Sequence, residues 1–317
     1  MVDYDPHEWR SHLLDIRGSM VREISYRVLL CVAWSAIVAS VQEYCRRELD
    51  VSLAVPPIAH ALIGVFLSLL LVFRTNSSYE RFWEGRKQWG SIVNESRNLG
   101  RLASVVLASD PDLARRMIGW TIAFSYATMH HLRGKKTLGS AADNLRGEDL
   151  TAALEENHLP LVVARRITEQ IIEARRRGLV SDYVMTALDQ NVQQLVDYMG
   201  ACERIHKTPM PFAYMVHQRR AVIFYCFTLP FALLDPFGWW TILVTLLIAY
   251  TLYGIEEIGV EIEDPFGEDD NDLPLERFCA TIELNLREMM NTLPGESTTA
   301  KDDESTVLMP ETTRPVN

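Results

Sequence analysis

Unbroken hydrophobic stretches fall in two blocks of the chain, and the clearest of them is Leu53–Phe73. It contains no charged residue, and His60 is its one strongly polar side chain. About 20 apolar residues are enough for a helix to cross the hydrocarbon core of a bilayer. A shorter stretch, Ile24–Val41, precedes it and carries Arg27, whose long side chain can reach the membrane interface. Residues 24–73 therefore predict two transmembrane helices, with a soluble core helix as the alternative for the first.

The second block, residues 221–255, contains two further apolar stretches, Ala221–Leu234 and Phe237–Ile255. Asp235 and Pro236 lie between them and predict a tight turn. Pro230 predicts a kink in the first stretch, which neighbouring helices in a membrane bundle can accommodate. The pattern as a whole predicts four transmembrane helices.

Between the two blocks the apolar residues recur with a period near 3.6, which is typical of amphipathic helices. Asp110-Pro111-Asp112 and His158-Leu159-Pro160 predict helix starts, and Gly178 predicts a helix end. No alternating strand pattern of useful length occurs, so the fold class is predicted to be all-α. The predicted divisions are an N-terminal cytosolic segment at 1–23, transmembrane helices at 24–73, a cytosolic helical region at 74–220, transmembrane helices at 221–255, an acidic segment with a C-terminal helix at 256–293, and a disordered tail at 294–317.

Basic residues are unevenly distributed about the predicted spans, and cytoplasmic loops are usually the richer in Lys and Arg. One side of the membrane would carry Arg10, Arg17, Arg22, Arg27, Arg74, Arg81, Arg86, Lys87, Arg219 and Arg220. The other side would carry only Arg46 and Arg47. Both termini and the 74–220 region are therefore predicted to be cytoplasmic.

Composition excludes several classes of function. A net charge of −11 argues against nucleic acid as a partner. The 5 cysteines form no CxxC pair and no disulfide or zinc framework. No nucleotide-binding or catalytic motif occurs, so the chain is predicted not to be an enzyme.

Ile58, Leu62 and Phe66 repeat at a spacing of four and share one face of the predicted second span. Several copies of this helix around one axis would stack these side chains into apolar rings, which can act as a hydrophobic constriction. Periodicity alone fits ordinary packing against lipid or other helices equally well, because almost any apolar helix contains such a triplet.

An acidic segment, Asp264–Pro274, follows the last predicted span. Closely spaced carboxylates in a flexible loop suit Ca²⁺, although the ligand spacing is not that of an EF-hand. A solvated turn is the alternative, and Asp272 is also a candidate N-cap for the helix entered at Pro274. The adjacent pair His130-His131 is a poor metal site, because neighbouring positions on a helix point in different directions. His60 is either a functional intramembrane group or a hydrogen-bonded residue near the end of its span.

The segment Phe73–Arg101, FRTNSSYERFWEGRKQWGSIVNESRNLGR, closely resembles the signature that follows the second span in the bestrophin family, in particular its microbial and plant branch. Three further stretches match in the right order: Arg17-Gly18-Ser19, Thr208–Tyr214 and Asp264–Pro274. The resemblance covers roughly residues 17–290.

The resemblance implies a homopentameric ion channel in the lipid bilayer, with second-span helices lining the pore. Counted from Tyr79-Glu80, the three rings of the family's pore neck fall on Ile58, Leu62 and Phe66, with Leu62 a mild departure from the usual residue. No cofactor is required. The resemblance also implies a Ca²⁺ clasp, whose ligands here would be Glu268, Asp269 and Asp272, while Asn271 departs from an acidic position. A second, cytosolic constriction would lie near Asp182–Thr186.

The leading functional expectation is passive conduction of chloride or other small anions, with Ca²⁺ as a modulator. A cation-conducting homologue is the near alternative. A membrane-anchored, Ca²⁺-sensing scaffold is the alternative of another class.

Overall fold

The computed structural model describes residues 18–139, 141, 145 and 154–294. Residues 1–17 and the predicted tail beyond 294 lie outside the described residues. Every described element is helical, and no strand occurs within the described ranges. In chain order the elements are α2 (Val21–Tyr44), the π-helical η1 (Cys45–Leu49), α3 (Pro57–Val106), α4 (Pro111–Leu132), α6 (Leu159–Arg176), α7 (Asp182–Lys207), α8 (Phe212–Phe237), the 3₁₀ turn η3 (Gly238–Trp240), α9 (Thr241–Glu261) and α10 (Leu275–Asn291).

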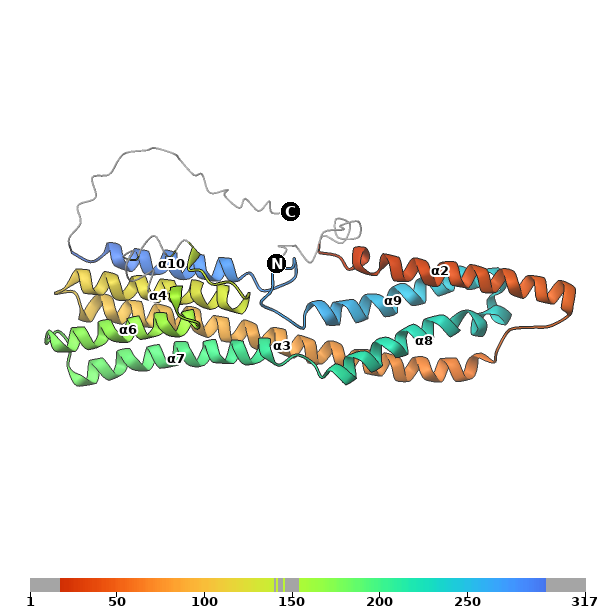
Figure 1. Cartoon of the computed structure of the whole chain (residues 1–317), viewed down its shortest axis with the longest axis horizontal. Coiled ribbons are helices and arrows are strands. Elements are labelled where there is room, and N and C mark those ends of the chain that lie inside the picture. Colours follow the sequence, from red (N-terminus) through yellow and green to blue (C-terminus); the bar gives the residue numbers. More distant parts are fainter. Residues whose placement is uncertain (1–17, 140, 142–144, 146–153, 295–317) are drawn as a thin grey trace, which may run out of the picture.

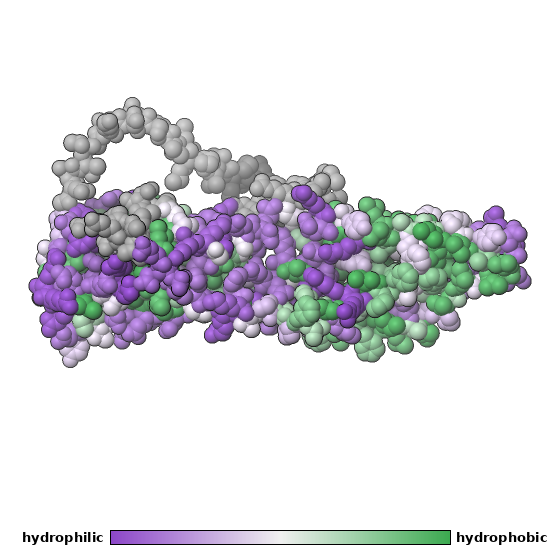
Figure 2. All heavy atoms as spheres, in the orientation of Figure 1, coloured by the Kyte–Doolittle hydropathy of each residue, from purple (hydrophilic) through white to green (hydrophobic). Residues whose placement is uncertain are grey.

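The molecule is an elongated bundle in two halves, joined along its length by α3 (Figure 1). One half consists of α2, α8, α9 and the start of α3. The other half consists of α4, α6, α7, α10 and the rest of α3. The first half presents a mainly hydrophobic surface and the second a mainly hydrophilic one (Figure 2). A membrane-spanning half and a water-exposed half explain this division.

Three continuous helical stretches are long and apolar enough to cross a membrane: Val21–Leu49, Pro57–Val106 and Phe212–Glu261. The last contains both α8 and α9, which pack against each other and are joined through η3. This arrangement is compatible with four membrane crossings, which stay a prediction.

Several predicted boundaries were wrong. The second span was expected to start at Leu53, but α3 starts at Pro57, since Pro is well suited to the first helical turn. The first span was predicted over Ile24–Val41, but helical structure continues to Leu49. The turn expected at Asp235-Pro236 comes later, because both residues still belong to α8 and Gly238, with φ of 53°, caps that helix.

The predicted ends in the polar half were confirmed. The Asp110 side chain accepts a hydrogen bond from the amide of Leu113 at the start of α4. His158 caps α6, and Gly178 follows its end with φ of +73°. Capping side chains and a residue able to adopt positive φ determine these boundaries locally.

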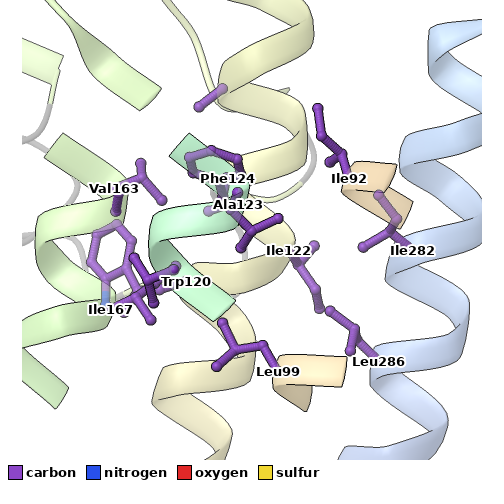
Figure 3. Close-up of a cluster of buried hydrophobic side chains, with 14 of the residues drawn as sticks. Ile92, Leu99, Trp120, Ile122, Ala123, Phe124, Val163, Ile167, Ile282 and Leu286 are labelled. Carbon is purple, nitrogen blue, oxygen red and sulfur yellow. The ribbon is translucent and has the colours of Figure 1, made fainter. Parts of the chain in front are cut away.

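The main hydrophobic core lies in the polar half, where α3, α4, α6 and α10 meet (Figure 3). Ile92 and Leu99 of α3, Ile122 of α4, and Ile282 and Leu286 of α10 belong to this one cluster (Figure 3). All five side chains are almost fully buried. The C-terminal part of α3 is thus held by ordinary core packing.

Gly100 and Gly200 form a matched pair of helical glycines. A Cβ on Gly100 would lie 2.2 Å from Cδ2 of buried Leu286, whereas a Cβ on Gly200 would meet nothing within 4 Å. We expect Gly100→Ala to lower the stability by about 1–3 kcal/mol through overpacking. Gly200→Ala should raise it by roughly 0.5–1 kcal/mol, because alanine favours the helix. Thermal unfolding of the two purified variants checks the opposite signs; two changes of the same sign would contradict this view of the α3–α10 contact.

Arg81 of α3 connects the two halves. Its guanidinium donates to the backbone carbonyls of Ile205 and Thr208, at the end of α7, and to that of Glu263, just after α9. The segment Phe73–Arg101 therefore fixes both the entry to the second membrane block and the exit from it.

Candidate functional site

The candidate pore surface is one face of α3, formed by Ile58, Leu62 and Phe66. These side chains are 72%, 58% and 68% exposed in the single chain. They lie on the side of the helix turned away from buried Leu67 and Leu71, which pack against the other apolar helices. We call these three positions the neck face.

Most of the apolar part of α3 is open. Only 17% of its most hydrophobic 18-residue stretch is buried within the chain. An isolated protomer encloses no pore, so the neck face requires lipid or other protein to cover it.

His60 lies on the opposite side of α3 from the neck face. Its ring stacks on Tyr225 of α8, with 4.2 Å between ring centroids and an interplanar angle of 14°. Its Nε2 has no hydrogen-bond partner among the described residues. Gly64, one turn on, leaves room for the Tyr225 hydroxyl, which lies 2.8 Å from the place of a Cβ. His60 therefore helps to pack α3 on α8, and the hydrogen bond considered as an alternative is not formed by Nε2.

A buried charge cluster joins the apolar helices at the level where the two halves meet. Glu256 of α9 accepts from Arg74 at 2.9 Å, from Arg219 at 2.9 Å and from Arg27 at 3.4 Å. The side chains of Glu256 and Arg74 are only 3% and 1% exposed. We call this set, which comprises Arg27, Arg74, Arg219, Glu256, Glu257 and Glu263, the Glu256 network.

The Glu256 network brings charged residues of α2, α3, α8 and α9 to the same height in the bundle. Each arginine comes from a different helix: Arg27 from α2, Arg74 from α3 and Arg219 from α8. The sequence predicts that these three arginines lie on one side of the membrane, and their contact with one carboxylate agrees with that prediction. The partnership itself was missed by sequence reasoning, and the signal for it was the presence of Arg27 and Glu256 at the ends of otherwise apolar stretches.

The predicted Ca²⁺ ligands lie in the loop between α9 and α10. Asp272 is buried, its Oδ2 accepts from the amide of Asp269 at 2.7 Å, and burial raises its pKa to about 6. The Asp272 carboxylate lies 2.5 Å from where a Cβ on Gly267 would be, so the loop closes on it only with glycine there. Asp272 is not the N-cap of α10, since Pro274 occupies that position.

Glu268 points elsewhere. Its carboxylate pairs with Lys135 and lies 3.8 Å from Arg133, and the Lys135 ammonium lowers the pKa of Glu268. Among the described residues, Glu268, Asp269 and Asp272 do not come together as a three-ligand group. The side-chain amide of Asn271 donates to the carbonyl of Gly18 at 3.0 Å and so ties the loop to the segment before α2.

The remaining sequence candidates lie in the polar half. Asp182–Thr186, the region predicted to hold a second constriction, begins α7, and Tyr183 there is 91% exposed. His130 and His131 point apart, as expected: His130 faces Gly139, whereas His131 faces His158 and Glu203.

Comparisons with known proteins agree with this architecture. A model of the family described as Bacterial/Fungal Bestrophin protein matches residues 1–288. A Synechocystis protein named as a voltage-dependent anion channel-forming protein is 40% identical over 294 residues, covering 91% of this chain and 94% of that protein. A Nostoc protein with the same descriptive name is 38% identical over 291 residues, covering 90% and 93%.

Solved structures resemble it as well. The crystal structure of a bacterial bestrophin homologue from Klebsiella pneumoniae superposes with a TM-score of 0.79 at 33% identity, covering 84% of this chain and 98% of that one. With its long apolar helices, the protein is an integral membrane protein of all-α architecture. The family match over nearly the whole chain, together with the shared fold, shows that this chain belongs to the bacterial and fungal bestrophin family.

Proposed function

We propose that the chain is one subunit of a homopentameric channel that conducts chloride and other small anions passively. The observation that carries the proposal is the neck face, an exposed row of large apolar side chains on the helix that links the two halves. Relatives named as anion channel-forming proteins over nine-tenths of the chain support anions as the cargo.

In this proposal five α3 helices surround the axis, and Ile58, Leu62 and Phe66 form three stacked rings. An apolar constriction favours ions that shed part of their hydration shell easily, and it closes by dewetting when it narrows. The polar half, with both termini, lies in the cytoplasm, and α2, α3, α8 and α9 each cross the bilayer once.

Planar-bilayer recording of the purified protein tests this function. In a chloride gradient the reversal potential should move toward the chloride equilibrium potential, and a sodium gradient should leave it nearly unchanged. A reversal potential that follows sodium would identify a cation-conducting homologue. The absence of single-channel currents, with or without Ca²⁺, would overturn the proposal.

The assembly is tested separately by native mass spectrometry. Five subunits support the channel. A monomer or dimer would favour a membrane-anchored scaffold, because neither can enclose a pore with α3.

We further propose that Ca²⁺ binds at the loop between α9 and α10, held by Asp269 and Asp272. Glu268 joins these ligands only when it leaves Lys135, so Lys135 competes with the cation. Hard oxygen ligands in such a loop suit Ca²⁺.

Substitutions at Lys135 and Asp272 test the calcium proposal. Lys135→Met should increase Ca²⁺ affinity severalfold because it frees the Glu268 carboxylate, whereas Asp272→Asn should abolish binding. Lys136→Met is the matched control, since Lys136 contacts the carbonyl of Glu155 and no carboxylate of this loop. Isothermal titration with Ca²⁺ provides the measurement, and equal affinities for the Lys135→Met and Lys136→Met variants would refute the competition.

A further inference from the structure

Two histidines and one glutamate from three helices meet in the polar half, away from both the neck face and the acidic loop. His131 lies in the last turn of α4, His158 caps α6, and Glu203 lies in the last turns of α7. The Nε2 atoms of both histidines lie 2.8 Å from Oε1 of Glu203. Within the described part of the chain, this is the one group of three such side chains whose ligand atoms all lie within 4.8 Å of one another.

The donor set selects a class of cation. Two imidazole nitrogens and one carboxylate oxygen match the three protein ligands of open zinc sites, whereas Ca²⁺ and Mg²⁺ prefer oxygen. Zinc bonds of about 2.0–2.2 Å place neighbouring ligand atoms slightly farther apart than a hydrogen bond does, so a small outward movement would admit the ion.

The surroundings allow a metal to enter. The side chains of His131, His158 and Glu203 are 24%, 35% and 17% exposed, so solvent reaches this group. Burial is the main cause that lowers the pKa of His131, and it favours the neutral imidazole. The neutral imidazole is the form that coordinates a metal, with its one proton on the other ring nitrogen.

Lys207 holds the second oxygen of Glu203 at 3.3 Å and so orients the carboxylate from outside the group. One existing bond opposes metal binding: Nδ1 of His158 accepts from the amide of Leu161 at 3.3 Å. A metal on Nε2 places the proton on Nδ1 and breaks this bond, which is a long cap in a helix that also has Pro160 in its first turn.

We propose that His131 Nε2, His158 Nε2 and Glu203 Oε1 form a site for a divalent transition metal of the zinc class, with an open fourth position. The ion would tie α4, α6 and α7 together beside Ile205, whose carbonyl is held by Arg81 of α3. A metal there would stiffen the polar half where α7 leads into the second membrane block.

The test is titration of the full chain, purified in detergent, stripped of metal by a chelator and freed of any polyhistidine tag. Isothermal titration with Zn²⁺ should give one site per protomer. His131→Gln and His158→Gln should each weaken it by about tenfold or more, since the loss of an outer-shell partner alone costs about 10–100-fold. His206→Gln is the matched control, because His206 lies on α7 but contacts Asp264 instead.

Two further measurements keep the proposal falsifiable. Co²⁺ should give the visible bands of tetrahedral coordination without sulfur-to-metal charge transfer, and Asp272→Asn should leave these bands unchanged. Zn²⁺ should raise the unfolding temperature of the wild type and of His206→Gln but not of the other two histidine variants. The proposal is overturned if the wild type shows no saturable Zn²⁺ binding, or if His131→Gln and His158→Gln, still helical by circular dichroism, bind Zn²⁺ as the wild type does.

Discussion

Replacing Glu256 by alanine is expected to destabilise the protein by about 3–5 kcal/mol, the range for removing one partner from a buried ion pair. Glu256 accepts from Arg27, Arg74 and Arg219, and its removal leaves the Arg74 guanidinium 1% exposed with Glu263, 3.9 Å away, as its remaining carboxylate. The Nε and Nη2 atoms of Arg74 already have no hydrogen-bond partner among the described residues. A charge at this depth is costly because water does not reach it and its remaining carboxylate lies beyond hydrogen-bond distance.

The measurement is thermal unfolding of purified variants in one detergent. Glu256→Gln should have a smaller effect, because the amide retains one acceptor oxygen. Glu43→Ala is the matched control, since Glu43 pairs with Arg47 on a surface where such pairs contribute about 1 kcal/mol or less. If Glu256→Ala unfolds at the same temperature as Glu43→Ala, the Glu256 network is not what holds the four apolar helices together.

Changing Ile58, Leu62 and Phe66 together to alanine is expected to increase the single-channel current severalfold and to weaken closure. Each substitution removes most of a large apolar side chain, so the proposed rings widen and water no longer withdraws from the constriction. These side chains are 58–72% exposed in the protomer, so their truncation should leave the fold of the chain intact. Planar-bilayer recording gives the current, and native mass spectrometry shows whether the pentamer persists.

The matched control is Leu243→Ala with Leu247→Ala on α9. These two leucines are also exposed and four residues apart, but they belong to a helix that is not proposed to line the pore. Currents should match the wild type in this control. Unchanged currents in the neck variant would place the pore on another face of α3.

Local chemistry explains why much of the fold could be predicted. Asp110, His158 and Gly178 determine helix ends through their own capping groups or backbone freedom, and the structure has those ends where expected. The wrong boundaries fall where the apolar stretch and the helix do not coincide. At Leu53 the apolar stretch begins before the helix, and at Asp235-Pro236 the helix continues beyond the apolar stretch. Hydropathy indicates whether a segment prefers lipid or water, whereas backbone hydrogen bonding determines where its helix starts and ends.

The candidate sites divide in the same way. The shared helix face of Ile58, Leu62 and Phe66 could be predicted because a spacing of four is a property of one helix. The pairing of Glu268 with Lys135, and of Asn271 with Gly18, could not be, because each joins segments far apart in the chain.

The sequence by itself determined an all-α membrane protein, the helix that carries Ile58, Leu62 and Phe66, and the family to which the residues from Phe73 to Arg101 point. Only the tertiary structure decided that Arg27, Arg74 and Arg219 share Glu256. It also decided that His131, rather than its neighbour His130, contacts Glu203 together with His158. The physical reason is that periodicity specifies which side of a helix a residue occupies. The partners of a charged or metal-binding side chain are instead determined by the packing of helices that lie far apart in the sequence.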